Sequence, residues 1–168
     1  TFNTCLALQN ETSVEPCAHI SGVTSDKEQI KSILDSYKKA GFKKLVVLRG
    51  DLPSGVGGYG DFIYAKDLLE YIKSLYGNQF HLQVGAYPEV HPQAKSAEDD
   101  FIHFSNKVKA GADGAITQFF FSPEAYYEFM DRSEKANLGI PITPGLITIT
   151  NKESLLSCLL YTSPSPRD

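Results

Sequence analysis

The chain has 168 residues, of which 42% are hydrophobic and 21% are charged, and its formal net charge is −4. This composition is typical of a globular protein with a hydrophobic core and excludes a disordered or fibrous chain. The acidic balance and the scattered lysines argue against nucleic acid as a partner, and no apolar run is long enough to cross a bilayer. No charged and then apolar leader begins the sequence, so we expect a cytoplasmic protein.

The first half of the chain predicts two strands and two helices after a helical or irregular start up to about residue 10. Residues 12–16 form a polar connection, and an apolar strand is predicted at 17–21. The next helix has Ser25 and Glu28 as a capping box, and Gly41 ends it. Its apolar positions are Ile30, Ile33, Leu34 and Tyr37. A second strand at 45–48 leads into a glycine-rich loop and then a helix whose apolar face carries Phe62, Ala65, Leu68, Leu69, Ile72 and Leu75.

The second half continues the alternation. A third strand is predicted at 80–87, followed by a loop with two prolines and by a helix that Ser96 and Asp99 cap. Phe101, Phe104 and Val108 would form the inner face of that helix. A fourth strand is predicted at 114–119, and Ser122-Pro123 begin a helix that carries Tyr126, Phe129 and Met130. Residues 142–147, interrupted by Pro144-Gly145, form a plausible fifth strand.

Apolar strands that alternate with helices, with one unit in roughly every 30 residues, predict right-handed βαβ crossovers and a parallel sheet. An open doubly wound sheet and a closed eight-stranded barrel both fit this pattern. Residues 55–60, Gly-Val-Gly-Gly-Tyr-Gly, have the G-x-G-x-x-G spacing, but no acidic residue ends the next predicted strand as a dinucleotide-binding fingerprint requires. A G-x-x-x-x-G-K-[ST] phosphate loop is absent. Residues 157–168 do not continue the pattern and are similar to a translated sequencing adapter. We therefore expect one α/β domain at 1–156 and a non-native tail at 157–168.

Polar side chains lie at or just after the carboxyl ends of successive predicted strands. They are His19, the Arg49-Gly50-Asp51 triplet, Tyr87 with His91, and Gln118. In a parallel sheet these ends share one edge, so we expect a cluster suited to a polar heterocycle with anionic groups. Each residue also has a structural interpretation: a buried core histidine, an Arg49–Asp51 ion pair, or an amide that satisfies a strand end. His81, His91 and His103 have no ligand spacing, so no metal is expected.

Three motifs in order and spacing resemble the methylenetetrahydrofolate reductase family. They are Leu48–Pro53, Ala86–Pro92 with Ala94-Lys95-Ser96, and Ala115–Phe121, and Pro144-Gly145-Leu146 and Asn151 also fit. The resemblance covers roughly residues 5 to 152. It implies an incomplete (βα)8 TIM barrel, roughly strands 3 to 7, from a homo-oligomeric FAD enzyme. That enzyme reduces 5,10-methylenetetrahydrofolate to 5-methyltetrahydrofolate with electrons from NADH or NADPH.

The resemblance also implies roles for single positions. The FAD contacts would be His19, Arg49, Gly50, Asp51, Ala65, Tyr87, His91, Ala94, Asp100 and Lys107. Asp51 and Gln118 would be catalytic and would bind the folate, and Gln118 would also contact nicotinamide. His103 and Asn106 depart from the family pattern at two positions that often help to hold FAD.

The glutamate that serves as general acid on the family's first strand has no counterpart, because Glu28 and Glu89 lie in other contexts. We therefore expect this piece to be inactive by itself. We also expect it to be poorly stable, because an unclosed barrel exposes edge strands and apolar helix faces. The alternative is a non-catalytic flavin- or folate-binding barrel that lacks the acid. A weaker one is another flavin barrel oxidoreductase, for example one related to proline dehydrogenase, against which Asp51 and Gln118 argue.

Overall fold

The computed structural model describes residues 1–51, 60–91, 94–148, 151, 153 and 156. Most of the predicted glycine-rich loop and the predicted tail at 157–168 lie outside these residues. No helix in the described ranges is both long and apolar enough to span a membrane.

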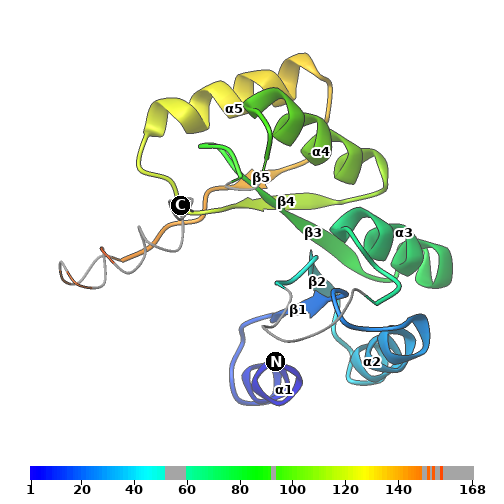
Figure 1. Cartoon of the computed structure of the whole chain (residues 1–168). Coiled ribbons are helices and arrows are strands. Elements are labelled where there is room, and N and C mark those ends of the chain that lie inside the picture. Colours follow the sequence, from blue (N-terminus) through cyan, green and yellow to red (C-terminus); the bar gives the residue numbers. More distant parts are fainter. Residues whose placement is uncertain (52–59, 92–93, 149–150, 152, 154–155, 157–168) are drawn as a thin grey trace.

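Five helices and five strands alternate along the described chain (Figure 1). In order they are α1 (Phe2–Glu11), β1 (Cys17–Ser21), α2 (Lys27–Lys39), β2 (Lys44–Leu48), α3 (Ala65–Tyr76), β3 (His81–Ala86), α4 (Ala97–Lys109), β4 (Gly114–Thr117), α5 (Pro123–Lys135) and β5 (Ile142–Thr143). All neighbouring strands pair in parallel, and their spatial order is β1-β2-β3-β4-β5. The described strands show no reversal of order, which the doubly wound alternative requires.

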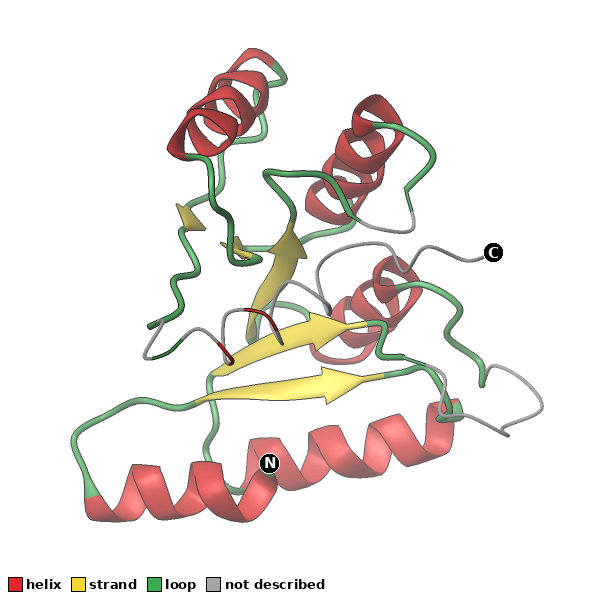
Figure 2. Cartoon of the chain, turned by 60° about the vertical axis from the view of Figure 1, so that its left-hand side comes forward, coloured by secondary structure: helices red, strands yellow, loops and turns green. Residues whose placement is uncertain are grey.

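In the described chain one face of the sheet is buried in every strand, and the other is only partly covered. A register row of Ile20, Val47, Val84, Ala115 and Ile142 crosses all five strands, and every member is buried. On the opposite face His19 is exposed and Gln83 and Ile116 are only partly buried, whereas Val46, between His19 and Gln83 in the register, is buried. Right-handed crossovers between consecutive strands place each connecting helix on the same side, which explains the difference. Figure 2 shows the curved sheet from a second side, with α1 and α2 below its first two strands.

The N-terminus forms a helix rather than an irregular segment because it has an apolar partner. The Phe2 ring stacks on Tyr37 with centroids 5.9 Å apart and also contacts Phe42. Gln9 Nε2 donates to the carbonyl of Ala40 at 2.9 Å. These contacts fix α1 against the carboxyl end of α2.

Two of the three predicted helix caps are confirmed, and one is wrong. The hydroxyls of Ser96 and Ser122 accept the expected backbone N–H bonds at the starts of α4 and α5. The capping box of α2, however, is formed by Asp26 and Gln29, not by Ser25 and Glu28. The reason is tertiary: the Ser25 carbonyl accepts from Asp61 N at 3.1 Å, which holds Ser25 in the preceding turn.

Several predicted boundaries also shift. β3 ends at Ala86, β4 at Thr117 and β5 at Thr143, all before the predicted ends. Pro144 has no N–H to continue the ladder, which explains the last of these. Ile33 and Leu75 are exposed although they were expected on inner faces, because Leu34 and Tyr76 occupy those faces instead. Phe62 is buried, but it precedes α3.

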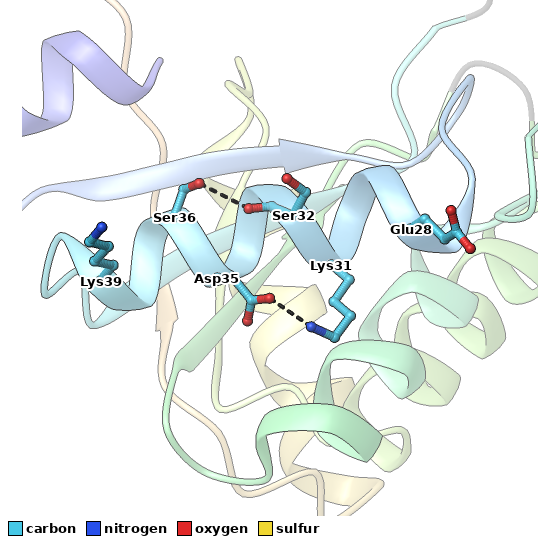
Figure 3. A pocket seen from close by; sticks show the side chains of 6 residues that line it. All are labelled: Glu28, Lys31, Ser32, Asp35, Ser36 and Lys39. Atoms are coloured by element: carbon cyan, nitrogen blue, oxygen red, sulfur yellow. Dashed lines mark hydrogen bonds and ion pairs between the residues drawn. The ribbon is translucent and has the colours of Figure 1, made fainter.

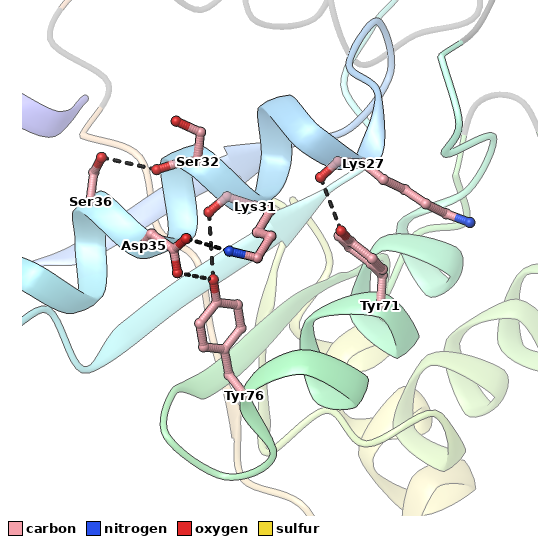
Figure 4. A network of polar contacts seen from close by, with 7 residues as sticks. All are labelled: Lys27, Lys31, Ser32, Asp35, Ser36, Tyr71 and Tyr76. Atoms are coloured by element: carbon pink, nitrogen blue, oxygen red, sulfur yellow. Dashed lines mark hydrogen bonds and ion pairs between the residues drawn. The ribbon is translucent and has the colours of Figure 1, made fainter.

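A polar network joins α2 to α3 (Figure 4). Tyr76 donates its hydroxyl to Asp35 Oδ1 at 2.6 Å, and Lys31 Nζ lies 2.7 Å from Asp35 Oδ2. Tyr71 donates to the Lys27 carbonyl at 3.0 Å. Burial and the adjacent Asp35 carboxylate raise the pKa of Tyr76, so the phenol remains a donor at all physiological pH values.

Asp113 links the amino ends of two neighbouring units. Its Oδ2 accepts from Leu82 N at 2.8 Å and lies 3.0 Å from Lys73 Nζ, whose side chain is largely buried. Asp113 therefore satisfies the N–H of the second residue of β3 while it holds α3 against the sheet.

We predict that Asp113→Ala lowers the free energy of unfolding by about 1–3 kcal/mol, because it leaves the buried Leu82 N–H without its acceptor. Asp113→Asn retains an oxygen that can accept this bond, so it should cost less. Urea unfolding measures both, with Asp131→Asn on the exposed side of α5 as the control. Equal losses for the alanine and asparagine variants would contradict the role of the Leu82 hydrogen bond.

Candidate functional site

The predicted site residues follow three neighbouring strands at the same edge of the sheet. Arg49, Gly50 and Asp51 follow β2, Tyr87 and His91 follow β3, and Gln118 follows β4. Gln118 N donates to the Ala86 carbonyl at 2.7 Å, which places its backbone next to the residue that precedes Tyr87. The Gln118 side chain is exposed. The parallel register therefore brings these dispersed positions to one edge, as the sequence predicted.

Gly50 is required by the geometry of its turn. Its φ is +84°, a left-handed conformation, and an added Cβ would overlap the Ser21 hydroxyl oxygen. The same hydroxyl donates to the Arg49 carbonyl at 2.9 Å. This hydrogen bond ties the turn after β2 to the end of β1. The left-handed Gly50 then turns the chain between Arg49 and Asp51.

Tyr87 and His91 form the partly buried centre of the site. Their rings meet edge to face with centroids 4.4 Å apart, and His91 N donates to Asp100 Oδ2 at 2.9 Å. Burial lowers the pKa of the His91 imidazole, with Asp100 opposing and Arg49 and Lys107 adding to the shift. Burial also raises the pKa of the Tyr87 phenol. Both rings therefore favour their neutral forms near pH 7.

Two cations and two carboxylates act on these rings electrostatically. Asp51, Asp100 and Arg49 all act electrostatically on both Tyr87 and His91, and Lys107 acts on His91. Lys107 Nζ donates to the Gly85 carbonyl near the end of β3, and burial lowers the pKa of this lysine to about 8. The adjacent Asp100 carboxylate limits that fall. A partly buried, incompletely neutralised ammonium group favours an anionic ligand at this edge.

The structure does not bring every predicted residue into this cluster. His19 was predicted at the carboxyl end of its strand, but it lies in the middle of β1, in register with Val46. Its side chain is exposed on the partly covered face, so the alternative of a buried core histidine is wrong as well. Ala65 begins α3, and Ala94 N donates to the His91 carbonyl at 2.9 Å.

Sequence reasoning missed the part that Glu89 plays at this edge. Its Oε1 accepts from Phe121 N at 2.9 Å and from Ser122 N at 2.8 Å, at the start of α5. The sequence signal was an acidic residue in the loop of one unit and unpaired helix-start amides in the next unit. Only the register of β3 and β4 joins the two.

Two hollows on the described surface differ in their relation to this cluster. One, of about 390 Å³, is a shallow depression along α2, away from the cluster, that is lined by Glu28, Lys31, Ser32, Asp35, Ser36 and Lys39 (Figure 3). All six side chains come from one helix, and the Lys31–Asp35 ion pair lies within the set. A smaller hollow of about 160 Å³ lies between α4 and α5 and touches the cluster at Tyr87 and Asp100. In the described ranges, no three His, Cys, Asp or Glu side chains are grouped to hold a metal.

Comparison with known proteins gives one family. A family model described as methylenetetrahydrofolate reductase matches residues 1–162, which include the first part of the segment predicted to be a non-native tail. A 5,10-methylenetetrahydrofolate reductase of Pectobacterium carotovorum subsp. carotovorum is 40% identical over 148 residues, which are 88% of this chain and 48% of the relative. The Escherichia coli (strain K12) enzyme of the same name is 39% identical over 86% of this chain and 47% of its own length.

More distant similarities agree. A protein of Zea mays named methylenetetrahydrofolate reductase (NADH) 1 is 32% identical over 89% of this chain and 27% of its own length. The chain spans about half the length of the bacterial relatives. Among solved structures, 2,3-dimethylmalate lyase of the PEP mutase/isocitrate lyase superfamily has a TM-score of 0.57 at 11% identity. The match covers 96% of this chain and 64% of the lyase chain. At this identity it shows a similar fold and nothing more.

We predict that Gly50→Ala destabilises the protein by about 2 kcal/mol or more, because it adds a steric overlap with Ser21 to the strain of a left-handed residue. Gly139→Ala is the matched control. Gly139 has a φ of +65° with nothing near its Cβ position, so the change should cost only the strain of about 1 kcal/mol. Chemical unfolding compares the two, and equal losses would rule out the overlap.

The lowered pKa of His91 predicts a stability that depends on pH. The unfolded chain binds this proton at the ordinary imidazole pKa of 6.5, above the folded value. The contribution is therefore complete above pH 6.5 and is lost as the pH falls toward the folded pKa. Urea unfolding from about pH 7.5 to about pH 5 should show a smaller loss for His91→Asn than for the wild type. His103→Asn, on the exposed side of α4, should follow the wild type, and parallel profiles for all three would contradict the prediction.

Proposed function

The chain belongs to the methylenetetrahydrofolate reductase family, and from this premise we propose that it is the central part of a flavin-dependent folate reductase. The proposed reaction converts 5,10-methylenetetrahydrofolate to 5-methyltetrahydrofolate at the expense of NADH or NADPH. The observation that carries the proposal is that Arg49, Asp51, Tyr87, His91 and Gln118 follow neighbouring parallel strands at one edge of the sheet.

We further propose that the sheet is an incomplete (βα)8 barrel, roughly strands 3 to 7. Consecutive parallel order and one partly covered sheet face are what a segment of such a barrel would show. The fold likeness to 2,3-dimethylmalate lyase and the half-length match to the bacterial relatives support the same interpretation. On this proposal the 168-residue chain does not catalyse the whole reaction by itself.

The side chains at the edge fit FAD in their chemistry. Arg49 and the partly buried Lys107 offer positive charge for a diphosphate, and Asp100 and the backbone at Gly50 offer acceptors and donors for polar ring edges. Tyr87 and His91 offer neutral aromatic faces. Ala65, at the start of α3, and Ala94, in the loop after His91, are small side chains. Bound FAD would supply hydride transfer between the nicotinamide and the folate.

The remaining work of the site falls to Asp51 and Gln118. Asp51 is exposed, and its carboxylate can accept hydrogen bonds from the amino-pyrimidine part of a pterin. The exposed Gln118 amide can donate to and accept from folate or nicotinamide in turn. Together they would orient the one-carbon unit and limit its freedom, a positioning effect.

A second candidate is a non-catalytic flavin- or folate-binding barrel. It is favoured by one observation: neither glutamate weighed as a general acid is available in the described chain. Glu28 lies on the first turn of α2, and the Glu89 carboxylate is engaged by two backbone amides. Sequencing the source DNA across both ends of this reading frame separates the candidates, because an upstream strand that supplies a glutamate restores the enzyme.

For the natural full-length protein we predict bound FAD, bleaching of its absorbance by NADH or NADPH, and reoxidation by 5,10-methylenetetrahydrofolate. Asp51→Asn should slow the folate half-reaction about tenfold or more, the effect of weakening one charge-assisted hydrogen bond. The rate at which NADH or NADPH reduces the FAD of this variant should change less. Stopped-flow absorbance resolves the two steps, with Asp131→Asn as the control. Protein without flavin would refute the proposed function, and equal losses in both steps would refute the pterin role of Asp51.

A further inference from the structure

We propose that Glu89 is a positioning residue that locks the loop after β3 to the loop after β4, and so fixes Tyr87 and His91 relative to Gln118. The roles of the positioned residues rest on the proposed function, whereas the lock itself is a feature of this chain. Glu89 is neither a substrate contact nor an acid in this proposal.

The lock is a pair of hydrogen bonds that cross between two βα units. Glu89 Oε1 accepts from both Phe121 N and Ser122 N, at 2.9 and 2.8 Å. These amides precede α5 and have no partner within the helix. A carboxylate at this end also interacts favourably with the helix dipole, so the contact is stronger than a bond between neutral groups.

The loop that carries Glu89 is held in a defined shape on its other side. Val90 has a φ of +72°, an unfavourable value for a β-branched residue, and its N–H donates to the Tyr87 carbonyl at 3.2 Å. His91 N then donates to Asp100 Oδ2, on α4. The same short turn is therefore tied to its own helix through His91 and to the next unit through Glu89. A conformation of this kind persists only where its surroundings hold it.

Gln118 lies between two anchors of the β4 unit to the β3 unit. On one side its own N–H donates to the Ala86 carbonyl, and on the other side Phe121 N and Ser122 N donate to Glu89. The Gln118 side chain is exposed, so packing does not hold it in place. Its position therefore depends on the backbone from 118 to 122. Loss of the Glu89 anchor would free one end of that segment next to Tyr87.

Capping of α5 does not require Glu89. The Ser122 hydroxyl accepts from Ala125 N at 3.2 Å and donates to Glu124 Oε2 at 2.9 Å, so the helix has its own cap. Glu98 and Arg132 join α4 to α5 at 2.6 Å through side chains of the two helices themselves. Glu124 and Glu98 are therefore acidic residues that make structural contacts but do not join the two loops. They serve as matched controls.

The first test measures amide hydrogen exchange in the natural full-length protein without ligand. In Glu89→Ala the N–H groups of Phe121 and Ser122 should exchange at least about tenfold faster. In Glu89→Gln the amide oxygen can still accept both bonds, so most of the protection should return. Glu89→Asp is shorter and should lie between them, which keeps the test valid if the alanine variant does not fold. Glu124→Ala and Glu98→Gln should leave these two amides protected.

The second test is a double-mutant cycle with Gln118→Ala on the KM for folate. If Glu89 acts through Gln118, Glu89→Ala raises this KM about tenfold in the wild-type background and much less in the Gln118→Ala background. The affinity for FAD and its reduction by nicotinamide should change less, and Glu89→Gln should restore the KM.

Unchanged exchange at Phe121 and Ser122 in Glu89→Ala would overturn the lock, and additive effects on KM would overturn its action through Gln118. A wild-type protein without flavin or activity would refute the proposed function alone, because the exchange measurement would still decide whether Glu89 joins the two loops.

Discussion

Parallel hydrogen bonding between consecutive strands is the constraint on which the other features of this protein depend. The register sets Ile20, Val47, Val84, Ala115 and Ile142 in one buried row. It therefore also sets the carboxyl ends of all five strands at one edge. Since right-handed crossovers place the connecting helices on one side, the opposite face of the described sheet is only partly covered, and His19 is exposed on it. Both the core and the grouping of polar side chains follow from this single arrangement.

Side chains beyond the ladder join neighbouring units at that edge. The Ser21 hydroxyl binds the turn after β2, Glu89 binds the start of α5, and Thr117 Oγ1 accepts from Gly145 N at 2.8 Å. At the opposite edge Asp113 joins α3 to β3. The two edges differ in what they support: Asp113 stabilises the fold, whereas the ties at the carboxyl edge also set the relative positions of the proposed site residues.

The electrostatics of the carboxyl edge are unfavourable in isolation. Burial lowers the pKa of Lys107 to about 8 and also lowers the pKa of His91. Desolvation of the Lys107 ammonium is only partly offset by the adjacent Asp100 carboxylate and by the hydrogen bond to the Gly85 carbonyl. An anionic ligand would supply the missing charge. This is the physical reason for assigning the diphosphate of the proposed cofactor to Lys107 and Arg49.

The sequence by itself determined the alternating strands and helices, the caps at Ser96 and Ser122, and the family, because these depend on local patterns and contiguous motifs. It also predicted that Asp51, Tyr87 and Gln118 lie at one edge, since parallel strands require it. Only the tertiary structure decided that Asp26 rather than Ser25 caps α2, that His19 is exposed on the partly covered face, and that Glu89 binds α5. Each of these outcomes depends on residues about 30 or more positions away along the chain, or on which face of the sheet the helices cover. A local pattern carries no information about such contacts until the strands are in register.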